Sequence, residues 1–160
     1  MLSNFSISIP QASLAVTILG STIGTYLALS PPNPSPDSPS SEVPSDSIHP
    51  LNITSRHTGK IALAPFGLLA LHTAGLAITH PEIPSFLLRN GAENGLEISL
   101  ITWSAAIAIP LALILCAGIP LRLVSYSSLG KNFTFALTLP DRLQTNGIYR
   151  YMQHPSYTGL

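Results

Sequence analysis

Three apolar stretches dominate the pattern of hydrophobic and polar positions along the chain. They cover residues 12–29, 61–79 and 98–121, and none of them contains Asp, Glu, Lys or Arg. A helix needs about 20 such residues to cross the roughly 30 Å hydrocarbon core of a bilayer. The pattern therefore predicts an all-α protein, a polytopic transmembrane helix bundle with about three spans and a cytosolic membrane-surface segment at the C-terminus.

The first apolar stretch allows a second interpretation. A secretory signal peptide also has an apolar core, and the small residues around Ala28 and Ser30 would suit cleavage. A signal peptide needs a basic region in front of this core, however, and residues 1–11 contain no Lys or Arg. Retention as a first transmembrane helix is therefore the preferred prediction, and cleavage stays open as the alternative.

A polar segment separates the first two stretches. Between Ser30 and Pro50 the chain carries seven prolines and seven serines. Such a segment cannot bury enough apolar surface to offset its chain entropy, so we expect a disordered linker over residues 30–58. The predicted organisation is a first transmembrane helix region at 1–29, this linker, transmembrane helices two and three at 59–121, and a polar region at 122–160.

The composition of the 160-residue chain narrows the possible functions. Hydrophobic residues make up 46% and charged residues 9%, and seven Lys and Arg balance seven Asp and Glu. This balance excludes a basic nucleic-acid binder, which needs a surplus of Lys and Arg for phosphate contacts. The single cysteine, Cys116, excludes an internal disulfide and a cysteine-based zinc site, and no metal site is predicted. We expect Cys116 to be a small, buried, apolar residue.

Basic residues predict the orientation of the spans, because cytosolic loops carry more Lys and Arg than lumenal loops. Arg89 is the one basic residue between the second and third stretches. The other six flank the linker or follow the third stretch: Arg56, Lys60, Arg122, Lys131, Arg142 and Arg150. This asymmetry places the N-terminus and the loop 79–97 in the lumen, and the linker and the C-terminal segment in the cytosol.

Two side chains within the apolar stretches need an explanation. His72 lies in the middle of the second stretch, where an unpaired polar group is costly. We expect a neutral imidazole that bonds to a neighbouring backbone or hydroxyl group, with a functional role as the alternative. Trp103 lies near the lumenal start of the third stretch, and we expect it to anchor that helix at the membrane interface.

The last forty residues combine polar and aromatic side chains with glycine and proline. Asn146-Gly147 predicts a turn because both residues tolerate positive φ, and one helical turn is expected between Ile148 and Gln153.

The His154-Pro155 pair after this turn predicts a helix boundary. His154-Pro155 disfavours helix at His154 and allows a new helix to begin near Pro155. Free N–H groups in the first turn of such a helix, with His154 and Tyr157 nearby, could hold an anionic group.

Three groups of residues in this region resemble the isoprenylcysteine carboxyl methyltransferase family. They are Leu129-Gly130-x-Asn132-Phe133-Thr134, Leu143-x-Thr145-x-Gly147-x-Tyr149-Arg150-Tyr151 and His154-Pro155-Ser156-Tyr157-Thr158-Gly159. His-Pro-x-Tyr-x-Gly at a membrane edge, preceded by Gly-x-Tyr, is the most specific of the three. The resemblance is confined to this C-terminal region. The upstream spans agree with the family only in being membrane helices that precede the motif.

The resemblance implies a multi-pass enzyme of the endoplasmic reticulum membrane that uses S-adenosyl-L-methionine. Its substrates would be the prenylated C-termini of processed CaaX proteins, and its product a methyl ester. Residues 122–160 would then begin the cofactor-binding region. The cofactor-binding residues carried over are Asp141, Arg142, Leu143, Gln144, Tyr149, His154, Pro155, Ser156 and Tyr157. Two positions depart from the family's pattern: Gln153 stands where an Arg often precedes the His, and Asp141 where a His is common.

The chain ends at Leu160, inside the His-Pro-Ser-Tyr-Thr-Gly motif. The resemblance implies further membrane helices and a segment whose Arg and Glu residues complete the site, so catalytic residues are expected beyond Leu160. We therefore expect an incomplete methyltransferase with low or no activity alone. Two alternatives stay open: a phospholipid or other small-lipid methyltransferase with a similar cofactor segment, and a non-catalytic membrane scaffold.

Overall fold

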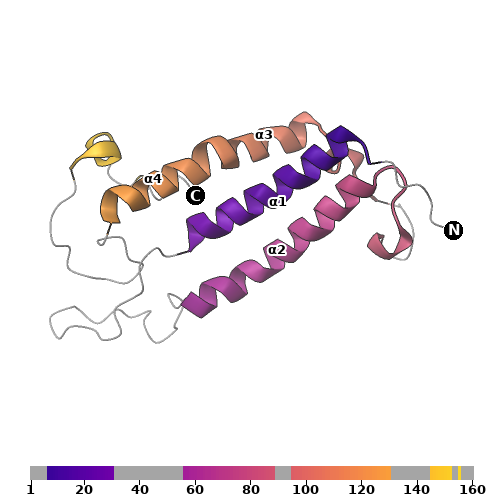
Figure 1. Ribbon diagram of the computed structural model, residues 1–160, viewed down its shortest axis with the longest axis horizontal. Helices are drawn as coiled ribbons and strands as arrows, with labels where there is room; N and C mark the ends of the chain where they lie inside the picture. The colour runs from indigo at the N-terminus through magenta and orange to yellow at the C-terminus, as the bar shows by residue number, and fades with distance from the viewer. Residues whose placement is uncertain (1–6, 31–55, 89–94, 131–144, 153–154, 156–160) are drawn as a thin grey trace. The chain divides into compact units, whose positions relative to one another are not determined.

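A computed structural model of the chain describes residues 7–30, 56–88, 95–130, 145–152 and 155, with the backbone alone for residues 56–60. The α-helices are α1 (Ile9–Leu29), α2 (Arg56–Thr79), α3 (Ala105–Leu113) and α4 (Ile119–Leu129). The short 3-10 helices are η2 (Ser85–Leu87), η4 (Ile98–Leu100) and η7 (Gly147–Arg150), and a π-helical turn, η5 (Ile114–Gly118), joins α3 to α4. The described part of the chain contains no strand, which confirms the all-α prediction (Figure 1).

Three helical segments in the described residues are long and apolar enough to cross a membrane. They are Ile9–Leu29, Ile61–Thr79 and Ile98–Leu129, and they confirm the three predicted spans. No more than 28% of the 18-residue apolar window in any of these spans is buried within the protein. Most apolar side chains of the spans therefore face outward, as they do on helices that are surrounded by lipid or by other membrane helices.

The first helix begins earlier than the apolar stretch that predicts it, because Ser8 and Gln11 cap its start. The backbone N–H of Ser8 donates to Gln11 Oε1 at 2.8 Å, and the backbone N–H of Gln11 donates to Ser8 Oγ at 3.4 Å. This reciprocal pair is a capping box, which satisfies donors that have no partner within the helix. Pro10 lies in the first turn, where its missing N–H costs nothing.

The third span differs from the single helix expected over residues 98–121. It opens with η4, is interrupted at residues 101–104, and continues through α3 and η5 to the end of α4 at Leu129. Pro110 lies inside α3 and Pro120 in the first turn of α4, and neither ends the helical segment. The wider π turn of η5 ends at Gly118, two residues before Pro120, whose nitrogen cannot donate a hydrogen bond within the helix.

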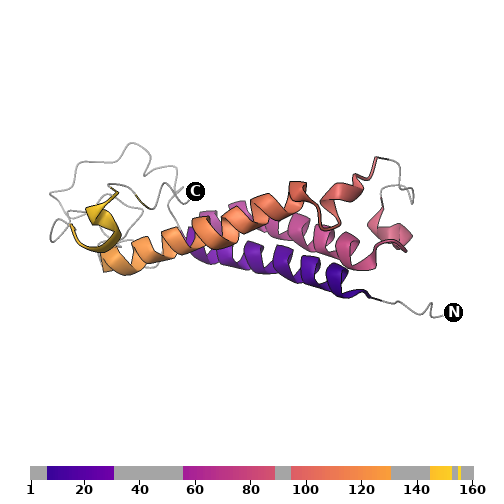
Figure 2. The ribbon, with the colours of Figure 1, turned by 90° about the horizontal axis from the view of Figure 1, so that it is seen from above.

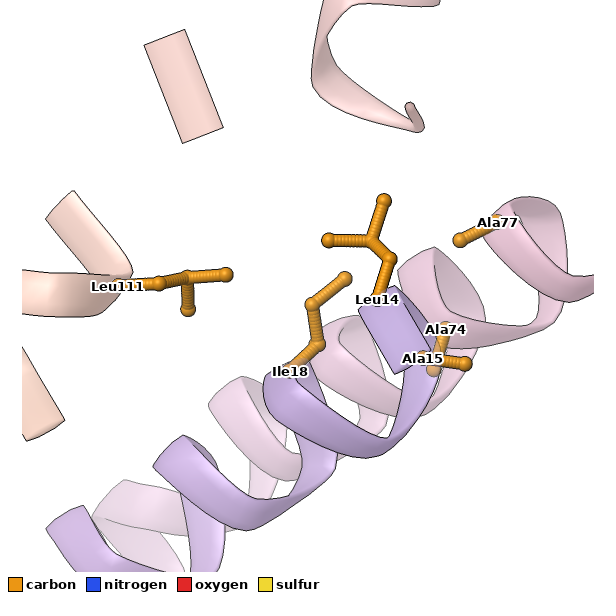
Figure 3. Close-up of a cluster of buried hydrophobic side chains, with 6 residues drawn as sticks. All are labelled: Leu14, Ala15, Ile18, Ala74, Ala77 and Leu111. Carbon is orange, nitrogen blue, oxygen red and sulfur yellow. The ribbon is translucent and has the colours of Figure 1, made fainter. Parts of the chain in front are cut away.

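The chain divides into two compact units, Met1–Gly24 with Pro65–Leu115, and Thr25–Ala64 with Cys116–Leu160. In the first unit α1 lies beside α2 and α3 (Figures 1 and 2). Its core is formed by Leu14, Ala15 and Ile18 of α1, Ala74 and Ala77 of α2, and Leu111 of α3. Figure 3 shows Leu14 and Ile18 between Leu111 on one side and Ala77 on the other. The small alanines allow the backbone of α2 to approach α1 closely.

Trp103 connects the third span to α1 within the same unit. Its indole Nε1 donates to Ser13 Oγ at 2.9 Å, and Ser13 Oγ donates to the backbone O of Pro10, also at 2.9 Å. The side chain remains 43% exposed. A half-exposed indole with a satisfied N–H suits the boundary between an apolar and a polar environment, and its role as a membrane anchor stays a prediction.

Two predictions about side chains in the spans are wrong. The His72 imidazole is exposed on α2 and has no hydrogen-bond partner in the described part of the chain, in place of the expected bond to a neighbour. Cys116 is exposed in η5, although a buried position was expected. The thiol of Cys116 is small and only weakly polar, so it loses little by facing an apolar outer surface. Nothing in the described residues explains the exposed position of His72.

Candidate cofactor-binding segment

The short helix η7 carries Tyr149, one of the predicted cofactor-binding residues. Asn146 precedes η7 in an extended conformation, and Gly147 has a φ of +63°, which confirms the predicted Asn-Gly turn. The backbone N–H of Tyr151 donates to the carbonyl O of Ile148 at 3.1 Å and closes the turn. The predicted single helical turn is therefore present and begins one residue earlier than expected.

The helix η7 packs against the C-terminal end of α4 in the second unit (Figures 1 and 2). A Cβ atom placed on Gly147 would lie 3.5 Å from Ser128 Oγ. Ser125, one helical turn before Ser128, is completely buried and lies near enough to Tyr149 to influence the pKa of its phenol.

The packing against α4 also changes the chemistry of Tyr149. Burial raises the pKa of its phenol above the ordinary value of 10.0, and the nearby Ser125 hydroxyl lowers the pKa by a smaller amount. The phenol is therefore neutral at physiological pH. A neutral phenol can both donate and accept a hydrogen bond, so Tyr149 can contact a polar ligand of either kind.

A second polar cluster on α4 holds the end of α1. Arg122 is only 4% exposed, and its Nε donates to the carbonyl O of Ala28 and, at 2.7 Å, to the hydroxyl of Tyr126. The Tyr126 hydroxyl in turn donates to the same carbonyl, and its ring centroid lies 5.6 Å from Arg122 Cζ.

The position of this cluster follows from the electrostatics of a helix end. Ala28 lies in the last turn of α1, where carbonyl groups lack partners within the helix and carry partial negative charge. The last turn of α1 contains no basic residue of its own. Arg122 therefore supplies from α4 the positive charge that the C-terminus of α1 favours.

The structure describes two of the predicted cofactor-binding residues. Tyr149 is partly buried in η7, and Pro155 is helical and completely buried, in agreement with a helix that begins near it. The others lie outside the described residues: Asp141, Arg142, Leu143, Gln144, His154, Ser156 and Tyr157. Among the described residues no group of His, Cys, Asp and Glu side chains could hold a metal ion.

The buried polar residues of α4 were not predicted as part of a site. Arg122 was expected only to help set the orientation of the spans, and no role was predicted for Ser125 and Tyr126. The three residues are spaced i, i+3 and i+4, which places them on one face of a helix. This spacing, directly after an apolar span, is the signal that could have identified them.

The part of the chain that contains α4 and η7 is also the part that is similar to a known protein family. Residues 110–160 match the model of the isoprenylcysteine carboxyl methyltransferase (ICMT) family. This match confirms the resemblance seen in the C-terminal motifs and supports a methyltransferase. The region that matches the ICMT-family model contains α4 and η7, and so Ser125, Tyr149, Arg122 and Tyr126, but not Ala28. No curated protein and no solved structure matches the chain.

Proposed function

We propose that the protein is an S-adenosyl-L-methionine-dependent methyltransferase that esterifies the C-terminal prenylcysteine carboxylate of processed CaaX proteins. The observation that carries this proposal is the ICMT-family match over residues 110–160. Within that match an apolar span is followed by the polar turn that holds Tyr149. A lipid-linked substrate and a polar cofactor need these two environments next to each other.

The cofactor is proposed to bind to the segment that surrounds η7 and Pro155. The proposed contacts are Asp141, Arg142, Leu143, Gln144, Tyr149, His154, Pro155, Ser156 and Tyr157. The described members fit this role, because Tyr149 offers a neutral phenol and Pro155 has a helical conformation. S-adenosyl-L-methionine would supply an electrophilic methyl group on its sulfonium sulfur.

In the proposed reaction the main task of the protein is to position the carboxylate and the cofactor. The α-carboxyl group of a prenylcysteine has a pKa of about 3.5, so it is ionised at neutral pH and needs no general base. The residues of the site must align the carboxylate oxygen with the methyl carbon and keep water away. The outward apolar surface of the third span offers a path for the prenyl chain from the lipid, while the polar segment receives the cofactor from the cytosol.

We further propose a multi-pass location in the endoplasmic reticulum membrane with the C-terminal segment in the cytosol. About 20 helical residues cross the hydrocarbon core, so a 32-residue segment that begins at Ile98 extends past it and leaves its last turns outside. Arg150, 5.9 Å from the ring of the exposed Tyr151, would lie among the lipid headgroups.

Methyl transfer in membranes that contain the protein tests the proposed function. The membranes receive labelled S-adenosyl-L-methionine and N-acetyl-S-farnesylcysteine, and the base-labile methyl ester is counted. His154→Ala should abolish the label that depends on the protein. His72→Ala is the matched control, because His72 is exposed on α2 outside the ICMT-family region, and it should leave the transfer unchanged.

The acceptor distinguishes the proposed function from its two alternatives. Label in phospholipid, with none in the farnesylcysteine ester, would show a lipid methyltransferase and overturn the proposed substrate. Membranes without label above the background of empty membranes would favour a non-catalytic scaffold if they stayed without label when the chain is expressed with any coding sequence that follows Leu160.

A further inference from the structure

The chain that follows α2 turns back toward the helix that it has just left. A Cβ atom placed on Gly75 would lie 3.7 Å from both Cδ methyl groups of Leu87, which belongs to η2. Gly75 lies four residues before Thr79, the last residue of the second span, a distance of about 6 Å along a helix. Eight extended residues could instead carry Leu87 about 26 Å away from Thr79. The short helix η2 therefore lies beside the end of α2 (Figures 1 and 2).

Phe86 occupies the outward side of η2. Leu87 packs against α2, whereas the Phe86 side chain is 83% exposed. The turn also satisfies part of its own backbone, because the N–H of Leu87 donates to the carbonyl O of Pro84 at 3.0 Å and the N–H of Leu88 to that of Ser85 at 3.2 Å. A large apolar side chain on a turn that bonds to itself gains by leaving water and loses few hydrogen bonds when it does so.

The surroundings of η2 are the ends of all three spans. Ala77, near the end of α2, packs in one core with Leu14, near the start of α1. Trp103, near the start of the third span, donates its indole N–H to Ser13 of α1. In a bilayer, headgroups and the adjoining parts of the acyl chains surround the ends of such spans. Phe86 is therefore exposed at the level where a membrane changes from polar to apolar.

We propose that η2 is a membrane-interface element, whose Phe86 side chain inserts into the lipid leaflet around the ends of the spans and holds the following loop close to the membrane. Lipid is the occupant of this exposed face, because the contact between Leu87 and Gly75 keeps Phe86 beside the apolar surface of α2 that the bilayer surrounds. The inference depends on the three membrane spans and is independent of the proposed methyltransferase activity.

Spin labels measure the depth of Phe86 in phosphatidylcholine nanodiscs that contain the full chain. A nitroxide is attached at Phe86→Cys or, as the matched control, at Glu82→Cys, in a Cys116→Ser background that leaves no other thiol. Glu82 is charged, exposed and part of the same loop. Oxygen concentrates in the bilayer and a nickel chelate in water, so the ratio of the two collision rates reports depth. This ratio should be several-fold higher at position 86 than at position 82.

A label on the neighbouring residue tests whether the Phe86 side chain itself holds η2 in the lipid. Ser85 is exposed next to Phe86, and a nitroxide at Ser85→Cys reports on the turn while Phe86 stays in place. Adding Phe86→Ser should lower the ratio of oxygen to nickel collisions at position 85 several-fold. Ile98→Ser is the control, because Ile98 is an exposed apolar residue outside η2 and its loss should leave the ratio unchanged. The fluorescence of Trp103, the one tryptophan of the chain, shows that each variant keeps its fold.

Three results would overturn the inference. Equal ratios at positions 86 and 82 would show that Phe86 lies no deeper than the charged part of its loop. A label at position 86 that is shielded from both reagents would mean that a protein surface, from a second copy or another partner, covers Phe86 in place of lipid. An unchanged ratio at position 85 after Phe86→Ser would show that η2 does not depend on Phe86 for its place at the membrane.

Discussion

The two buried serines among the described residues bond to carbonyl groups of their own helices. Ser21 and Ser125 are both buried, and each hydroxyl donates to a backbone carbonyl of its own helix, at 2.8 and 2.7 Å. In the described part of the chain no buried side-chain nitrogen or oxygen lacks a hydrogen-bond partner. An apolar bundle offers no water to such groups, so a polar residue is tolerated only where an acceptor lies within reach.

Arg122 is the residue whose loss should cost the most stability. Arg122→Leu removes the hydrogen bonds to Ala28 and Tyr126, and we expect a loss of about 2 kcal/mol, the contribution typical of a hydrogen bond that involves a charged group. Thermal unfolding in nanodiscs measures the change. Arg150→Leu is the control, because Arg150 is exposed and should contribute less than about 0.5 kcal/mol. Equal effects of the two substitutions would contradict a special role for Arg122.

Tyr149 should make stability depend on pH in the alkaline range. Its pKa in the folded protein lies above the ordinary value of 10.0, so the folded state retains the phenol proton more strongly than the unfolded chain does. The resulting stabilisation is fully present below pH 10 and is lost as the pH rises through the folded-state pKa. Thermal unfolding between neutral and strongly alkaline pH should show this loss, and Tyr149→Phe should reduce it. An identical pH profile for the variant would show that Tyr149 has an unperturbed phenol.

At the level of whole elements, α2 contacts α1 through small residues. Ala77 is completely buried in the core of the first unit, and Ala74 is nearly so. Ala77→Leu should force α2 away from α1 and cost about 1–3 kcal/mol, as overpacking of a dense core does. The midpoint of unfolding in a denaturing detergent measures the loss.

The same helix provides the control for this substitution. Leu69 is 62% exposed on α2, so Leu69→Ala should change the midpoint much less than Ala77→Leu, although it removes a larger side chain. A larger effect at Leu69 would mean that the outer face of α2 packs against another protein surface.

Sequence patterns predicted the helical elements better than their ends. All three spans are present, and the second ends at Thr79 as expected. The start of α1 was missed because a capping box between Ser8 and Gln11 lets the helix begin at Ile9, three residues before the apolar stretch. The end of the third span was missed because α4 continues through Arg122, whose charge would normally mark the end of an apolar helix.

At the scale of the whole molecule, retention of α1 gains support from its contacts with α4. The carbonyl of Ala28 accepts hydrogen bonds from both Arg122 and Tyr126, so cleavage near this residue would remove an acceptor of the ICMT-family region. We expect tags at the two ends of the protein to remain on one polypeptide of uncleaved mass in immunoblots. A C-terminal product shortened by about the length of α1 would instead establish a signal peptide.

Glycosylation mapping checks the proposed orientation. A sequon inserted in the loop 79–97 should receive a glycan, because this loop is expected in the lumen. Two of the three natural sequons, at Asn52 and Asn132, should stay unmodified because both are expected in the cytosol, while the third, at Asn4, is expected in the lumen. Glycans on the natural sequons and none on the inserted one would reverse the orientation and place the proposed cofactor segment on the wrong side for a cytosolic substrate.

The sequence by itself determined which segments are apolar spans, where the Asn146-Gly147 turn lies and to which family the C-terminal region is similar. These features depend on residues that are near each other along the chain, through hydropathy, backbone sterics and motif spacing. Tertiary structure alone decided which polar side chains of α4 are buried and what they bind. Arg122 and Ala28 are 94 positions apart, and Tyr149 reaches Ser125 only because η7 folds back onto α4. Such pairs form when helices pack, and no local pattern encodes the partner.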